Sequence, residues 1–132
     1  MKRKIFLVAF LLTVLVVATA CNEYAESFEN GSLITASQAR NLMEQNPYAI
    51  ILDVRTQSEF DALHIPNAIL IPNEMLGLQE WDALSDKGAL ILVYCRSGSR
   101  SEQSVRLLVA MGYTNVLDFG GILSWPYEII SN

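Results

Sequence analysis

Two short runs of mainly apolar residues constrain the fold of this chain more than any other feature. Residues 48–54 have strand length and are too hydrophobic on both faces for a strand with one side in water, which favours a central position in a parallel sheet. Residues 89–94 form a second such run. A helical pattern follows each run, from Thr56 and from Ser101. This alternation predicts an α/β domain with a mostly parallel sheet.

Capping and turn residues place the other elements. Hydroxyl caps at 35–37 begin a helix that ends at Asn46, and in the later helix Val105, Leu108 and Val109 are expected to face the sheet. The predicted order is helix 35–46, strand 48–54, helix 56–63, strand 68–71, helix 73–84, strand 89–94, helix 101–111, strand 115–118 and a short helix holding Trp125.

The stretch YCRSGSR, residues 94–100, joins the second apolar run to its helix. We predict a loop from Cys95 to Arg100 and a helix that begins at Ser101. A thiol at the end of that strand would face backbone N–H groups and the positive end of a helix dipole, which both stabilise a thiolate. Arg96 and Arg100 add positive charge. The loop therefore predicts a nucleophilic cysteine in an anion-binding turn, and the alternative is a buried structural cysteine.

Cys21 and Cys95 are the only cysteines of the chain. If Cys21 carries a lipid, Cys95 has no partner for an internal disulfide, and a lone exported thiol is a liability unless it is used. One free cysteine and the single histidine, His64, cannot supply the ligands of a zinc or iron–sulfur site. We therefore predict no metal.

Residues 1–20 have the composition of a secretory signal, with a positive start at 2–4 and an apolar run at 5–18. That run is shorter than the roughly 20 residues that a membrane-spanning helix needs. Residues 18–21, Ala-Thr-Ala-Cys, resemble a bacterial lipobox, although leucine is commonest at its first position. We predict cleavage before Cys21 and lipid on that cysteine. The alternatives are an ordinary secretory signal and an uncleaved anchor.

Residues 21–32 are polar and acidic with little periodicity, which predicts a flexible tether between the membrane and a folded domain at 33–132. A lipid on Cys21 would place the protein in the cell envelope, outside the cytoplasm, on a periplasmic or extracellular face.

The chain is acidic, with a net charge of −5 at pH 7 that becomes −8 without residues 1–20, which hold three basic residues and no acidic one. Such a surface argues against binding to nucleic acid and against charge-driven binding to anionic lipid. The two arginines of the loop, Arg96 and Arg100, stand out against this background.

Five motifs in order resemble the single-domain rhodanese-like sulfurtransferases. They are ILDVR at 51–55, EF at 59–60, HIPNA at 64–68, CRSGSR at 95–100, and GGI at 120–122 with Trp125. The similarity runs from about residue 34 to residue 125. The family usually has glycine where this chain has Leu63 and Asn67. Asparagine tolerates positive φ better than most residues, so Asn67 is a mild change, whereas Leu63 is expected to shift the turn locally. The cysteine loop matches the family pattern C-R-[ST]-G-x-R completely.

The resemblance implies a rhodanese-like fold, with helices on both faces of the sheet, and transfer of sulfane sulfur. In this family the cysteine that matches Cys95 attacks a donor such as thiosulfate, becomes a persulfide, and passes the sulfur to cyanide or a thiol. Backbone N–H groups of the loop, here residues 96–100, hold the terminal sulfur. The partners implied are a small anionic donor and a thiol or cyanide acceptor, without a cofactor. We expect a monomer.

The other loop residues have predicted roles with alternatives. Arg96 is expected to recognise an anionic donor, or else to be a solvated charge. Arg100 either contacts the substrate and lowers the pKa of the thiol, or braces the loop through its carbonyl groups. Ser97 and Ser99 either donate hydroxyl hydrogen bonds to the bound sulfur or are small turn residues. Gly98 supplies a backbone angle that other residues resist.

Asp53 and Arg55 lie at the carboxyl end of the first apolar run, so we expect them at the same edge of the predicted sheet as Cys95. We expect them to form an architectural ion pair that braces the loop. Glu59 lies one helical turn further on, where it can pair with Arg55. His64 is predicted to be a hydrogen-bonded turn residue and not a general base.

Three other functions are alternatives to sulfur transfer. Cysteine phosphatases and arsenate reductases also hold a thiolate in an anion-binding turn, but their loop is C-x5-R, usually after a histidine. Here the spacing is C-x4-R and Tyr94 precedes the cysteine, which favours sulfur over phosphate. A passive persulfide carrier would use Cys95 in the same way, so only turnover separates it from an enzyme. A rhodanese-like module used only for binding is disfavoured by the complete loop.

Overall fold

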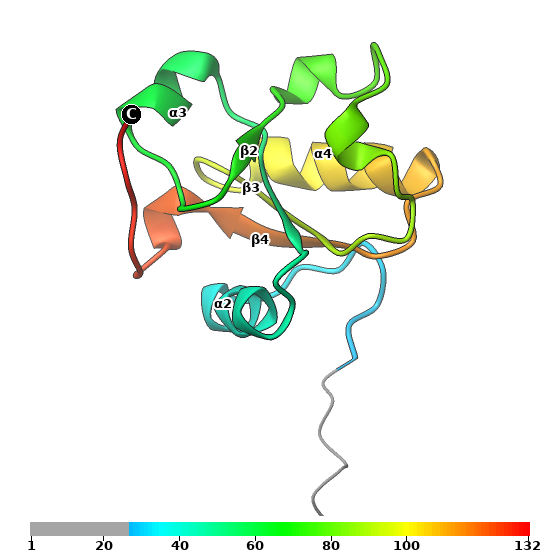
Figure 1. Cartoon of the computed structure of the whole chain (residues 1–132), viewed down its shortest axis with the longest axis horizontal. Coiled ribbons are helices and arrows are strands. Elements are labelled where there is room, and N and C mark those ends of the chain that lie inside the picture. Colours follow the sequence, from blue (N-terminus) through cyan, green and yellow to red (C-terminus); the bar gives the residue numbers. More distant parts are fainter. Residues whose placement is uncertain (1–26) are drawn as a thin grey trace, which may run out of the picture.

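A four-stranded sheet, entirely parallel, forms the centre of the domain, in the strand order β2-β1-β3-β4. The computed structural model describes residues 27–132, so the predicted signal at 1–20 and its Cys21 lie outside the described residues. Helix α2 covers one face of the sheet and helix α4 the other (Figure 1), which confirms the predicted α/β fold with helices on both faces. The strands are β1 (Ile50–Asp53), β2 (Ile69–Leu70), β3 (Ile91–Cys95) and β4 (Val116–Gly121).

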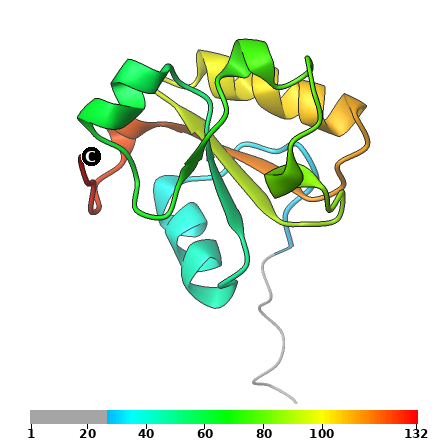
Figure 2. The same cartoon turned by 45° about the horizontal axis from the view of Figure 1, so that its top comes forward.

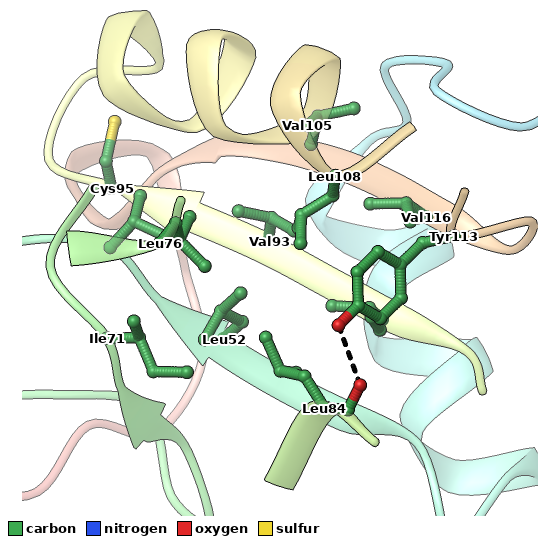
Figure 3. Close-up of a cluster of buried hydrophobic side chains, with 12 residues drawn as sticks. Leu52, Ile71, Leu76, Leu84, Val93, Cys95, Val105, Leu108, Tyr113 and Val116 are labelled. Atoms are coloured by element: carbon green, nitrogen blue, oxygen red, sulfur yellow. Dashed lines mark hydrogen bonds between the residues drawn. The ribbon is translucent and has the colours of Figure 1, made fainter. Parts of the chain in front are cut away.

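The central strands are apolar on both sides because each side faces its own cluster of buried side chains. Leu52 and Val93 belong to the cluster under α4 (Ser99–Ala110), which Figure 3 shows with Cys95 at one end. Their strand neighbours Ile51 and Leu92 belong to the cluster on the side of α2 (Ala36–Gln45). Because successive side chains of a strand point to opposite faces of the sheet, each apolar run contributes residues to both clusters.

Two helices begin at capping boxes, as the hydroxyl residues predicted. Thr35 caps α2 together with Gln38, and Thr56 caps the short helix α3 (Gln57–Ala62) together with Glu59. In each box the threonine oxygen accepts from the backbone N–H three residues on, and the partner side chain accepts from the threonine backbone N–H. These interactions are local, so the sequence pattern was sufficient to locate them.

The predicted helix at 73–84 is wrong. Its place is taken by two 3₁₀ turns, η1 (Asn73–Met75) and η2 (Asp82–Leu84), which lie on the α4 side of the sheet. Neither turn has a side-chain cap, and Gly77 disfavours a continuous helix between them. A short uncapped segment cannot offset the cost of helix nucleation. A third turn, η3 (Ile122–Ser124), ends before Trp125 instead of containing it.

Helix α4 begins at Ser99, two residues before the predicted start at Ser101. Gly98 ends the loop with a φ of 111°, and the helical backbone starts directly after it. The buried face of α4 differs from the prediction as well. Val105 and Leu108 are buried as expected, but Val109 is 37% exposed, and two serines, Ser101 and Ser104, are buried.

The chain before α2 packs along the free edge of β4, as Figure 2 shows for the segment that leads into that helix. The N–H of Gly31 donates to the carbonyl of Val116 at 2.7 Å, and Ile34 donates to Asp118 at 2.8 Å. Phe28 packs on the cluster beside α2. The folded part therefore begins before residue 33, so the end of the predicted tether at 21–32 belongs to the domain. Within residues 27–132 the helices are too short or too polar to cross a membrane.

Candidate active site

The four strands are parallel, so their carboxyl ends meet at one edge of the sheet. Cys95 ends β3 there, beside Gly121 of β4, and Asp53 ends β1. The Cys95 sulfur points toward the start of helix α4 (Figure 3), and the residue is 1% exposed. Ligands of open parallel sheets bind beyond this edge.

The Cys95 sulfur has two close hydrogen-bonding partners. The backbone N–H of Gly98 donates to it at 3.0 Å, and the Ser101 hydroxyl oxygen lies 3.6 Å away. Burial opposes the thiolate, but the hydroxyl and N–H of Ser101 and the N–H groups of Gly98 and Ser97 outweigh it and hold the pKa of the Cys95 thiol below its ordinary value. These donors therefore stabilise the thiolate of Cys95 against the cost of its burial.

The loop owes its shape to two glycines, one inside it and one facing it. Gly98 has a φ of 111°, in the left-handed region that strains a residue with a Cβ atom. Gly121 faces the loop so closely that an added Cβ atom would lie 2.2 Å from the carbonyl oxygen of Arg96. The strand pairing shifts at this point, so that Cys95 pairs with Gly121. Strand β4 thus packs directly against the backbone of the loop at Arg96 and Ser97. This packing supports a loop conformation in which backbone N–H groups face the sulfur.

Arg100 is held by Glu59 in a bidentate ion pair, with N–O distances of 2.7 and 2.8 Å. The prediction that Glu59 pairs with Arg55 is therefore wrong, because α3 turns the glutamate toward the first turn of α4. The hydrogen bond from Arg100 lowers the pKa of Glu59 to about 2. Of the two predicted roles of Arg100, the structure favours the structural one. Its guanidinium binds the carboxylate of Glu59, however, and not the carbonyl groups of the loop.

Arg96 differs from the other arginines of residues 27–132, because it alone has no carboxylate within salt-bridge distance. Its side chain is exposed, as are those of Ser97 and Ser99. Neither serine hydroxyl hydrogen-bonds another described residue, and the Cys95 sulfur is contacted instead by the backbone of Ser97 and by the hydroxyl of Ser101. Donation from Ser97 and Ser99 to a bound outer sulfur stays a prediction. Arg96 remains the available positive charge at the loop.

Asp53 and Arg55 form the predicted ion pair, with side chains that are 0% and 3% exposed and a closest N–O distance of 2.6 Å. The guanidinium of Arg55 also donates to the carbonyl of Leu63 at 2.7 Å and lies over the Tyr94 ring. It does not reach the carbonyl groups of the cysteine loop. The pair therefore braces the turn after α3 at Leu63, a position where this chain departs from the family pattern. Its contact nearest to the cysteine is with the ring of Tyr94, the residue before Cys95.

His64 is a hydrogen-bonded turn residue, as predicted. Its Nδ1 lies 2.8 Å from the carbonyl oxygen of Phe60, and its ring stacks on the Phe60 ring with centroids 3.8 Å apart. Its backbone pairs with Ile130 near the end of the chain. The neighbouring Asn67 has a φ of 65°, a conformation that the usual glycine of this position would also adopt.

Sequence reasoning missed two features of the site. The site predicted from the sequence does not include Ser101, although the spacing of this serine from Val105 and Leu108 puts it on the buried face of α4. That periodicity was a usable signal. The pairing of Glu59 with Arg100 had no comparable signal, because the two residues are 41 positions apart.

The geometry holds one sulfur atom among N–H groups, a hydroxyl and a helix N-terminus, which is suited to a nucleophilic thiolate and to an anionic product bound on it. Within residues 27–132, no three acidic, histidine or cysteine side chains are grouped so that they could bind a metal ion.

Comparison with known proteins finds similarity to rhodanese-like proteins and sulfurtransferases. The family described as the rhodanese-like domain matches residues 35–127. A sulfurtransferase from Allochromatium vinosum is 34% identical over 77 residues, which cover 58% of this chain and 70% of that protein. The thiosulfate sulfurtransferase PspE of Escherichia coli K12 is 35% identical over 71 residues, covering 54% and 68% of the two chains.

Other relatives are much longer. The adenylyltransferase and sulfurtransferase uba4 of Ogataea parapolymorpha is 35% identical over 91 residues, and the match covers 67% of this chain but only 22% of that protein.

Two solved structures resemble the domain. A rhodanese with anions from E. coli has a TM-score of 0.59 and 30% identity, covering 64% of this chain and 99% of that one. A rhodanese-like domain protein from Staphylococcus aureus has a TM-score of 0.64 and 30% identity, covering 76% and 98%.

Proposed function

Because this chain belongs to the rhodanese-like domain family, we propose that it is a sulfurtransferase that carries sulfane sulfur as a persulfide on Cys95. The observation that supports this most is the set of donors around the Cys95 sulfur, the N–H of Gly98 at 3.0 Å and the hydroxyl of Ser101 at 3.6 Å, at the start of a twelve-residue helix. Such donors stabilise negative charge on sulfur.

The reaction divides into two displacements at sulfur. In the first, the Cys95 thiolate attacks the sulfane sulfur of thiosulfate, the S–S bond of the donor breaks, and sulfite leaves with the electron pair. Cys95 then holds an outer sulfur that carries the negative charge. In the second, cyanide or a thiolate attacks this outer sulfur, and the Cys95 thiolate leaves. Atoms and electrons balance without a cofactor.

Arg96 is proposed to attract the anionic donor. It is exposed at the mouth of the loop and lacks the carboxylate partner that neutralises Arg100. A dianion such as thiosulfate gains most from this charge. The names of the relatives from E. coli and Allochromatium vinosum agree with a sulfur-transfer role.

The direct test is turnover with purified protein. Thiosulfate and cyanide should yield thiocyanate, and Cys95→Ala should abolish that yield while the circular dichroism spectrum stays unchanged. A parallel series with 3-mercaptopyruvate and glutathione persulfide identifies the preferred donor. Absence of turnover with all three donors would contradict an enzyme, and a persulfide that forms on Cys95 without turnover would indicate a carrier.

We also propose that the protein is a lipoprotein of the cell envelope, cleaved before Cys21 and anchored through lipid on it. The support is the sequence of residues 1–21 alone. Cys21→Ser should leave the chain unprocessed and without lipid in metabolic labelling with a radioactive fatty acid. Unchanged labelling of that variant would overturn the proposal.

A further inference from the structure

Ser101 has more hydrogen-bond partners than its hydroxyl can satisfy at once. Its side chain is fully buried on α4, and its oxygen lies 3.0 Å from the carbonyl oxygen of Gly98, 3.3 Å from that of Gly120 and 3.6 Å from the Cys95 sulfur. A hydroxyl carries one hydrogen and two acceptor lone pairs. The protonation state of Cys95 therefore decides which partner receives that hydrogen.

Two states follow from this geometry. When Cys95 is a thiol, its S–H donates to the Ser101 oxygen and Ser101 donates to a carbonyl, either of Gly98 or of Gly120. When Cys95 is a thiolate, the sulfur accepts only, so the Ser101 O–H stabilises it best by rotating toward the sulfur. The N–H of Gly98 donates to the sulfur in both states.

We propose that Ser101 is the positioning residue for Cys95, whose hydroxyl accepts from the thiol and rotates to donate to the thiolate. The inference rests on the proposed function and deepens it. The same sulfur is nucleophile in the first displacement and leaving group in the second, so the hydroxyl assists both. In the persulfide the inner sulfur is uncharged, and the hydroxyl returns to the carbonyls.

The charged groups around Ser101 do not replace this role. Arg100 directly precedes Ser101 in α4, and its guanidinium is held by Glu59. Asp118 of β4 faces Ser101 from the other side. Burial raises the pKa of Asp118, and the hydrogen bond that the N–H of Gly120 donates to its carboxylate opposes this rise. Among the described residues, Ser101 supplies the one side chain within hydrogen-bond distance of the Cys95 sulfur.

Ser104 provides a matched control. It is also a buried serine of α4, and its hydroxyl donates to the carbonyl of Arg100 at 2.8 Å, but it does not contact Cys95. Ser101→Ala and Ser104→Ala each remove one buried hydroxyl from the same helix. Ser101→Thr keeps the hydroxyl and tests whether that group alone matters.

The experiment is the pH dependence of Cys95 alkylation by iodoacetamide in the full chain, read from the Cys95 peptide by mass spectrometry. Ser101→Ala should move the midpoint upward by about one pH unit or more, the effect of one hydrogen bond to a charged group. Ser104→Ala and Ser101→Thr should keep the wild-type midpoint. A folded Ser101→Ala protein with an unchanged midpoint, or an equal shift in Ser104→Ala, would overturn the proposal.

A measurement on the wild type covers the case in which Ser101→Ala does not fold. The carbon-13 signal of the Ser101 Cβ should titrate with the Cys95 midpoint and move more than that of Ser104. Equal movement of both signals would contradict a rotating hydroxyl. These readouts do not require sulfur transfer, so a failure of the proposed function appears separately, as a wild-type protein that takes no sulfur from thiosulfate.

Discussion

Two arginine–carboxylate pairs lie near Cys95, and they differ in burial and in what they connect. Asp53 and Arg55 are two positions apart at the end of one strand, and both side chains are almost fully buried. Glu59 and Arg100 are 41 positions apart, and their side chains are 27% and 32% exposed. The first pair holds the turn at Leu63, whereas the second joins α3 to the first turn of the helix beside the sulfur.

The difference shows that the burial of an ion pair determines how much its loss destabilises the fold, whereas the elements that the pair joins determine which part of the site it positions. A buried pair is costly to break, because the remaining charge has neither water nor a partner. A half-exposed pair contributes little free energy of folding, but one that spans distant elements controls their relative position. We therefore expect loss of the first pair to affect stability most, and loss of the second to affect the reactivity of Cys95 most.

The largest expected effect is that of Asp53→Ala. This change leaves the Arg55 guanidinium buried with only the Leu63 carbonyl as a close acceptor, so the free energy of unfolding should fall by about 3–5 kcal/mol. Urea denaturation followed by circular dichroism measures it. A loss below about 1 kcal/mol would mean that the pair behaves as a surface pair.

Glu59→Gln should have the opposite profile. Glutamine keeps the capping box with Thr56, just as Gln38 serves Thr35, so the change removes the charge pair and little else. The free energy of unfolding should fall by about 1–2 kcal/mol, and kcat for thiocyanate formation by about tenfold, because the start of α4 loses its brace. Unchanged kcat in a destabilised protein would show that the pair serves only the fold.

The pH dependence of stability in acid also distinguishes the wild type from Glu59→Gln. Arg100 lowers the pKa of Glu59 to about 2 from the ordinary 4.5, so the stabilisation is fully present above pH 4.5 and is lost as pH falls toward 2. The stability difference between wild type and Glu59→Gln should therefore shrink by about 1–2 kcal/mol over this interval, after allowance for solvent screening. Urea titrations at several pH values measure it, and a constant difference would contradict the pairing.

The smallest effect is expected for Arg106→Gln. Arg106 pairs with Glu102 one turn along the same helix, but the two side chains are 76% and 59% exposed. The free energy of unfolding should change by less than about 0.5 kcal/mol, and the alkylation midpoint of Cys95 should not move. A shift of that midpoint would show that a charge far from the sulfur on α4 also influences the thiol, which would contradict a midpoint set by the contacts of Ser101 and Gly98.

Local patterns predicted most of the fold. Thr35 and Thr56 begin helices because each cap needs only residues within one turn, and the apolar run before Cys95 is a central strand because both faces are covered. The prediction of a helix at 73–84 was wrong because an apolar spacing without caps is compatible with separate turns. The first turn is followed directly by the buried Leu76, and the second contains the buried Leu84.

The sequence predicted the local parts of the site but not the contacts between distant elements. The position of Cys95 at the end of a strand followed from the sequence, since strand, loop and helix are consecutive. The partner of Arg100 depends on how α3 docks beside α4, which no local pattern encodes. The approach of Gly121 to the loop likewise depends on strand order, although the pair Gly120-Gly121 is visible in the sequence.

The central claim is that Cys95 carries sulfur, and intact-mass spectrometry of the protein after incubation with thiosulfate tests it most directly. We predict the addition of one sulfur atom, located on the Cys95 peptide, absent in Cys95→Ala and removed by cyanide. A wild-type mass that does not change, or an added sulfur that persists in Cys95→Ala, would contradict the account.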